Sequence, residues 1–216
     1  MLEEHPGFTL PRKDDGRTQQ RGLILRSAAA LYSLMAAFAF AWALVRENLD
    51  LFFHPHPALA LPWHAGLWGG LLAGIGFGSV VVVLTKATAG RAGWARKLLV
   101  EMKSVLGALE PKDALYLAAL SAISEELFFR GVLQAHLGLV WSSVIFGLAH
   151  IPRNRVFILW TFEAVIMGFC LGLLFLYTGN LLAPIAAHFT INYWNLLFMI
   201  RYEETGQTGE STRGSA

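Results

Sequence analysis

Long stretches without charged side chains constrain this chain more than any other feature of its sequence. Residues 27–45 include no ionisable side chain except Tyr32, and they are numerous enough to cross a hydrocarbon core of about 30 Å. Lipid offers no partner to an open backbone polar group, so a stretch of this kind must be helical. Five further stretches are predominantly apolar: 67–84, 113–133, 137–151, 156–177 and 181–200. The sequence therefore predicts an all-α fold, a polytopic transmembrane helical bundle of about six spans.

The composition excludes most other classes of protein. The chain is 55% hydrophobic and only 15% charged, whereas soluble domains average about 25% charged residues. Disordered chains, coiled coils and nucleic-acid-binding domains need charge that this sequence lacks, so no nucleic-acid partner is expected. The single cysteine, Cys170, excludes a disulfide framework and a thiolate zinc cluster.

The basic residues between the apolar stretches predict the orientation of the bundle. They concentrate before the first stretch and between the second and third, whereas the connection from the first to the second offers Arg46 alone against Glu47 and Asp50. Positively charged loops stay in the cytoplasm, so both termini are predicted to be cytoplasmic. Basic and apolar side chains alternate from Arg91 to Lys103, which favours an amphipathic helix lying on the inner leaflet.

Ionisable groups at membrane depth are costly and usually functional, and this chain has an unusual set of polar residues there. Its members are Glu125, Glu126, Arg130, His150, Glu163, His188 and Asn192. Glu126 and Arg130 are four residues apart, as are His188 and Asn192, so each pair shares one face of a helix. Counting about 1.5 Å per residue from the predicted helix starts brings Glu125, both histidines and Asn192 to a similar depth, nearer the cytoplasm. We expect a single convergent site inside the bundle.

This combination of side chains suits hydrolysis without a serine or cysteine nucleophile. Glu125 with His150 can take a proton from water. His188 with Asn192 can donate hydrogen bonds to the oxyanion of a tetrahedral intermediate. The alternative is a zinc ion held by Glu125, His150 and His188. A secondary transporter would also have buried carboxylates and histidines, but the sequence contains no visible repeat of the kind that such proteins show.

Three short motifs give the set a family resemblance. Residues 125–131 read E-E-L-F-F-R-G, residues 146–150 read F-G-L-A-H, and residues 188–192 read H-F-T-I-N. They resemble the E-E-x-x-x-R, F-x-x-x-H and H-x-x-x-N/D signatures of the CAAX-protease and bacteriocin-processing (CPBP, Abi) intramembrane proteases. The resemblance implies that Glu125 and His150 activate water, that His188 and Asn192 form the oxyanion site, and that Glu126 and Arg130 support them.

The apolar stretches and the resemblance together predict an organisation, a substrate class and a location. The chain divides into a basic cytoplasmic segment (1–26), two transmembrane helices with a basic amphipathic loop (27–111), a protease core (112–200) and a disordered tail (201–216). The implied activity is an intramembrane endopeptidase that needs no cofactor, with zinc as the alternative. Its expected partners are membrane lipids and a membrane-anchored protein or peptide substrate. The small size is closer to the bacterial branch, which implies a multi-pass protein of the bacterial cytoplasmic (inner) membrane. The alternative hypothesis is a non-catalytic membrane scaffold or immunity protein on the same fold.

Overall fold

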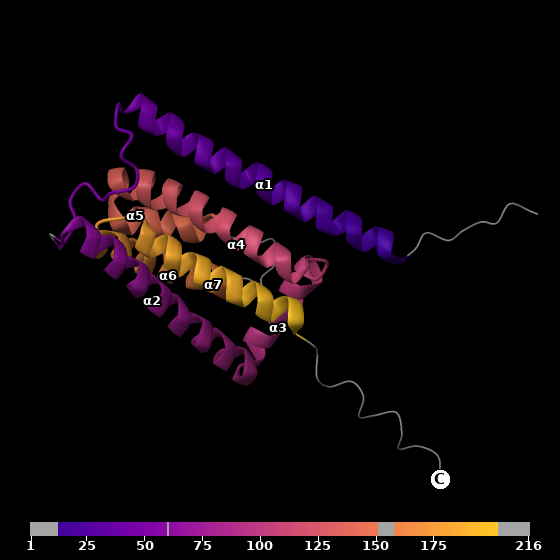
Figure 1. Ribbon diagram of the computed structural model, residues 1–216. Coiled ribbons are helices and arrows are strands. Elements are labelled where there is room, and N and C mark those ends of the chain that lie inside the picture. The colour runs from indigo at the N-terminus through magenta and orange to yellow at the C-terminus, as the bar shows by residue number, and fades with distance from the viewer. Residues whose placement is uncertain (1–12, 60, 151–157, 203–216) are drawn as a thin grey trace, which may run out of the picture.

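The computed structural model describes residues 13–59, 61–150 and 158–202, and every regular element in those ranges is a helix (Figure 1). The all-α prediction is confirmed. The helices follow one another as α1 (Lys13–Val45), α2 (Trp63–Arg91), α3 (Gly93–Leu106), α4 (Pro111–Glu126), the π-helix η1 (Leu127–Gln134), α5 (Ala135–Leu148), α6 (Ile158–Thr178) and α7 (Leu182–Arg201). The predicted tail from residue 203 onward, and Arg153 and Arg155, lie outside the described residues.

The predicted number of spans is corrected from six to four. Among the described residues, the helical segments long and apolar enough to cross a membrane are Gly16–Val45, Trp63–Arg91, Pro111–Leu148 and Ile158–Thr178. Two of the predicted spans fall within the continuous run Pro111–Leu148, which counts as one segment although the chain reverses direction inside it at Gly138. Helix α7 is long enough, but His188, Asn192 and Asn195 lower its hydropathy. Hydrophobic helices of this length make the chain an integral membrane protein.

A stripe of glycines on α2 brings that helix against α7. Gly66, Gly70, Gly74 and Gly78 recur every four residues and are all buried. A Cβ atom on Gly74 would lie 2.2 Å from the carbonyl oxygen of Ala183, a distance that no side chain tolerates. Small residues let helix backbones approach closely in membranes, so the stripe fixes the position of α7, which holds His188 and Asn192.

The segment α4–η1 and helix α5 form an antiparallel hairpin. Gly138 makes the reversal with φ +78° and ψ 172°, a conformation nearly restricted to glycine. Beyond it, the ring of Phe146 packs edge-on against Phe129 at a centroid distance of 4.9 Å, and the Ser142 hydroxyl donates to the carbonyl of Phe129 at 2.7 Å. The hairpin therefore returns the chain alongside the end of α4, where Glu125 and Glu126 lie.

Helix α1 runs beside α4 (Figure 1) and begins well before the predicted start of the first span. Its Arg21 guanidinium donates to both carboxylate oxygens of Asp113, at 2.6 and 2.7 Å, and lies 3.1 Å from Glu110. This ion pair joins the third turn of α1 to the first turn of α4, so part of the segment predicted as a separate basic N-terminus is helical and anchored. Helix α3 covers most of the predicted amphipathic stretch; its position on the inner leaflet stays a prediction.

Candidate active site in the bundle interior

Glu126 and Arg130 form a fully buried ion pair at the junction of α4 and η1. The Arg130 guanidinium donates to Glu126 Oε1 at 2.8 Å, and its second terminal nitrogen donates to the Gly168 carbonyl of α6 at 3.1 Å. Both side chains have an exposed fraction of 0–1%. The guanidinium also lies 4.6 Å from the ring centroid of Phe146. The pair consequently ties η1 to α5 and α6; its supporting role in catalysis stays a prediction.

The Glu126–Arg130 pair spans the start of a π-helix, η1. Its wider turn begins at Leu127, directly after the two glutamates, and includes Arg130. Interruptions of this kind in α-helices occur frequently at functional sites. The sequence prediction assumed a regular α-helix, in which each residue turns by about 100°. A sequence of helix formers does not reveal where the backbone hydrogen bonds shift by one residue.

His188 of α7 shares a carboxylate with Arg130. Its Nδ1 lies 2.7 Å from Glu126 Oε1, the same oxygen that accepts from the guanidinium. A carboxylate at this distance accepts a hydrogen bond, so Nδ1 carries a proton. The other ring nitrogen, Nε2, lies 4.0 Å from Glu125 Oε2. His188 therefore stands between the two glutamates of the first motif.

His150, at the end of α5, has its tautomer set by the main chain. Its Nδ1 lies 2.7 Å from the carbonyl oxygen of Phe146. A carbonyl can only accept, so Nδ1 carries the proton, and Nε2 of the neutral ring has a free lone pair. That nitrogen also lies 4.0 Å from Glu125 Oε2. The His150 side chain is 21% exposed, against 8% for Glu125 and His188, so the cluster is most accessible from the His150 side.

Glu125 occupies the centre of the cluster. Its Oε2 atom is buried and accepts no hydrogen bond from any described residue, yet it is equidistant from the two histidine Nε2 atoms. Burial of a carboxylate oxygen that accepts no hydrogen bond is unfavourable unless another hydrogen-bond donor reaches it. The structure thus brings Glu125, His150 and His188 together around one point.

Asn192 lies one helical turn beyond His188. Its Nδ2 donates to the Ser121 hydroxyl at 2.9 Å, and the amide has a second N–H that can serve as a donor. Ser121 and Tyr32 were absent from the predicted site, although Tyr32 interacts with both Ser121 and Glu125. Ser121 precedes Glu125 by four residues, and that spacing on one helix face could have indicated it. Tyr32 comes from α1, and no spacing rule reaches across that distance in sequence.

Glu163 does not belong to the cluster. It is exposed on α6, and no described residue forms an ion pair with it. Its neighbour Ala164 faces inward and packs with Phe129 and Phe146. The sequence also allows Glu163 to pair with Arg153 or Arg155, which lie outside the described residues.

A zinc ion would need a tighter arrangement of its ligands. Two ligand atoms around a tetrahedral zinc ion lie about 3.3 Å apart, whereas both histidine nitrogens are 4.0 Å from Glu125 Oε2. Within the part of the chain that the structure describes, no group of three His, Cys, Asp or Glu side chains has the spacing of a metal site. The residues predicted for zinc are therefore adjacent, but as they stand they do not fit the ion.

The fold and this site together define an integral membrane protein with a buried carboxylate–histidine cluster. Residues 109–194, which hold all three motifs, match the family model of the type II CAAX prenyl endopeptidases described as Rce1-like. The family resemblance inferred from the motifs is confirmed over this segment.

Among curated proteins, the chain is similar to the uncharacterized protein YpbD of Bacillus subtilis (strain 168). The two are 42% identical over 78 residues, which are 36% of this chain and 41% of YpbD. The match thus spans about two fifths of the length of the relative. No solved structure matches the chain.

Proposed function

We propose that this protein is an intramembrane endopeptidase that hydrolyses a peptide bond of a membrane-associated or lipid-anchored substrate with water activated by Glu125 and His150. The observation that carries the proposal is the position of Glu125 Oε2, which is buried, accepts no hydrogen bond from a residue that the structure describes, and lies 4.0 Å from both histidine Nε2 atoms. The match of residues 109–194 to CAAX prenyl endopeptidases supports the reaction class.

The spacing around Glu125 suits a water molecule. A water at a hydrogen-bond distance of about 2.8 Å from each of two atoms can bridge a separation of 4.0 Å. Such a water donates one proton toward Glu125 Oε2 and the other toward the lone pair on His150 Nε2. Loss of a proton to either group generates the hydroxide that attacks the substrate carbonyl, and the protonated group then donates to the departing amine.

His188 and Asn192 would stabilise the oxyanion that forms on attack. His188 Nδ1 is occupied by Glu126, so its Nε2 donates only when the ring is doubly protonated. With His188 as an imidazolium and His150 neutral, two carboxylates and two cations balance, and the buried cluster has no net charge. Buried charges are tolerated in membranes when they are paired in this way.

The location and partners follow from the same proposal. We infer a multi-pass protein of the bacterial cytoplasmic membrane with cytoplasmic termini, acting without a cofactor. Prenylated C-terminal peptides are the first substrate class to test, because the family model describes prenyl endopeptidases. C-terminal membrane-anchor peptides are the second, because the cluster is buried in a lipid-embedded bundle.

Cleavage by the purified, detergent-solubilised protein tests the proposal. Both peptide classes are incubated with the protein, with and without EDTA or phenanthroline, and the products are identified by mass spectrometry. Cleavage that persists under chelation is expected. Loss of cleavage under chelation, with recovery on added zinc, would show that a metal ion is needed for catalysis. A cellular phenotype that survives Glu125→Ala, with no peptide cut, would favour a non-catalytic scaffold.

A further inference from the structure

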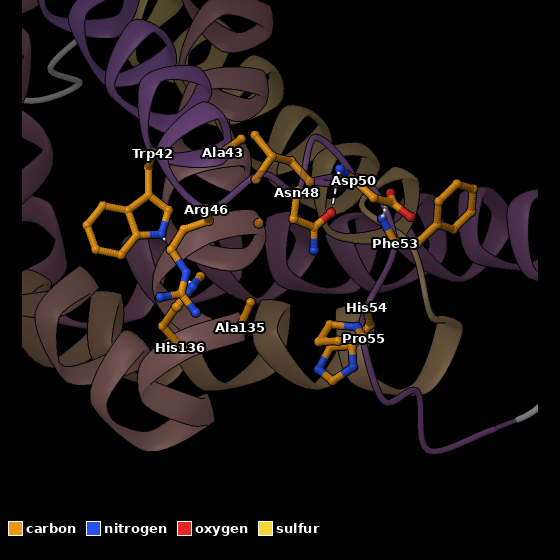
Figure 2. A pocket seen from close by; sticks show the side chains of 12 residues that line it. Trp42, Ala43, Arg46, Asn48, Asp50, Phe53, His54, Pro55, Ala135 and His136 are labelled. Carbon is orange, nitrogen blue, oxygen red and sulfur yellow. Dashed lines mark hydrogen bonds between the residues drawn. The ribbon is translucent and has the colours of Figure 1, made fainter.

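A cavity of about 380 Å³ lies at the end of the bundle where α1 passes into α2, and the proposed catalytic residues do not line it. The end of α1, the connection after it and the end of η1 form its walls (Figure 2). Its volume is in the range typical of small-molecule sites. The polar side chains of its wall determine which ligand group it can bind.

Two of the polar side chains in the wall satisfy each other. The Trp42 indole donates to His136 Nε2 at 3.4 Å, and His136 Nδ1 lies 2.8 Å from the carbonyl of Val132. The carbonyl can only accept and the indole can only donate, so His136 is neutral with its proton on Nδ1. Neither side chain has a strong donor left for a ligand.

Three other side chains that line the cavity, those of Arg46, Asn48 and His54, have hydrogen-bond donors available for a ligand. His54 Nδ1 accepts from the backbone N–H of His56 at 3.0 Å, so the proton of the neutral ring is on Nε2. Burial lowers the pKa of His54, which keeps the ring neutral at pH 7. The Asn48 side-chain oxygen accepts from the backbone N–H of Asp50 at 3.0 Å, which leaves its amide nitrogen as a donor.

Arg46 supplies a positive charge in the wall of the cavity. No hydrogen bond or ion pair joins its guanidinium to another described residue. In Figure 2 the guanidinium and the His54 ring flank the cavity, with the Asn48 amide nitrogen between them, whereas the Asp50 carboxylate points away toward Phe53. That carboxylate accepts from the Phe53 backbone N–H at 3.3 Å. A guanidinium, an amide and an imidazole N–H around one cavity match the oxygens of a phosphate group.

The position of the cavity favours a lipid as the source of that phosphate. Residues 46–55 connect two membrane-spanning helices, so they lie at the boundary of the membrane. Trp63 and Trp68 on the first turns of α2 are exposed, as is typical of aromatic side chains at the lipid headgroups. From the cavity, its donors and this position, we propose that Arg46, Asn48 and His54 bind the phosphate of a phospholipid headgroup.

Native mass spectrometry of the full chain tests the assignment. The protein is held in micelles with equal amounts of dioleoylphosphatidylglycerol and dioleoylglycerol, which has the same acyl chains but no phosphate. The wild type should retain one phosphatidylglycerol and no dioleoylglycerol. Arg46→Gln should retain about tenfold less, the loss expected for a charge-assisted hydrogen bond. His54→Phe keeps a ring against Phe175 and should lose about threefold.

The control is Arg91→Gln, which removes the same charge from an exposed site at the opposite end of α2 and should retain lipid like the wild type. An unchanged unfolding temperature shows that each variant folds. Equal retention by the wild type and Arg46→Gln, or equal retention of dioleoylglycerol, would overturn the assignment. Displacement of the lipid by inorganic phosphate, but not by sulfate at the same ionic strength, would assign the site to free phosphate and overturn the lipid source.

Discussion

At the scale of residues, the cluster depends on paired charges rather than on single groups. Glu126 Oε1 accepts from Arg130 at 2.8 Å and from His188 at 2.7 Å, so one oxygen anchors a structural cation and a proposed catalytic one. The motif spacing predicted the Glu126–Arg130 pair. It did not predict the contact with His188, because residues 62 positions apart are joined only by the packing of α7.

Removing one member of the buried pair should cost more stability than removing both. Arg130→Met leaves the Glu126 carboxylate without its main partner, and we expect a loss of about 3–5 kcal/mol in the free energy of unfolding. The double variant Glu126→Gln/Arg130→Met keeps the cluster neutral and should be more stable than Arg130→Met alone. Unfolding of the purified protein in detergent measures the double variant and each of the single variants Arg130→Met and Glu126→Gln. A double variant whose loss equals the sum of the two single losses would show that the pair is not coupled.

The rate of cleavage should depend on pH with a bell shape. Catalysis needs Glu125 and His150 able to accept a proton while His188 is doubly protonated, so activity falls on both sides of an optimum. The limits belong to the coupled cluster and not to single residues. Asn192→Ala should lower the rate by about 10²–10³-fold and keep the bell shape. A flat profile from about pH 5 to 9, with chemistry rate-limiting, would contradict the mechanism.

At the scale of elements, close packing of α2 on α7 positions half of the site. Gly70, Gly74 and Gly78 of α2 lie in the predicted apolar stretch 67–84, but periodicity alone does not say which helix they approach. The order of the helices was predictable because the apolar stretches mark it. The π-helix and the early start of α1 were not, since both depend on contacts between helices.

A methyl group on the glycine stripe should displace α7. Gly74→Ala places a Cβ 2.2 Å from the Ala183 carbonyl oxygen, and overpacking of this kind costs about 1–3 kcal/mol. Gly76→Ala is the matched control, because a Cβ there meets nothing within 4 Å. It should be neutral or stabilising by up to about 1 kcal/mol. Thermal unfolding in detergent compares the two, and equal midpoints would show that the stripe does not fix α7.

At the scale of the whole molecule, the two ends of the bundle differ in chemistry. One end has the Arg21–Asp113 ion pair and the basic helix α3, and the other has the cavity between α1 and α2. Composition predicted a membrane bundle, which the structure confirms with a corrected number of spans, whereas the orientation predicted from loop charge stays a prediction. The cavity was not predictable, because its residues lie in a connection without periodic pattern.

The orientation can be tested with single cysteines. In a Cys170→Ser background, His56→Cys should react with a membrane-impermeant maleimide in intact cells. Arg96→Cys should react only after the membrane is permeabilised, because basic segments stay in the cytoplasm. Both positions are exposed, so accessibility within the protein does not limit labelling. The opposite pattern would invert the proposed topology.

The most direct test of the account is the single-turnover cleavage rate of matched carboxylate variants, measured on the first peptide that the wild type cuts. Glu125→Gln removes the proposed proton acceptor and should lower the rate by at least about 10²–10⁴-fold. Glu163→Gln makes the same chemical change on an exposed part of α6, outside the cluster, and should stay within about twofold of the wild type. If Glu125→Gln cuts the peptide as fast as Glu163→Gln does, Glu125 does not activate the water, and the proposed mechanism is wrong.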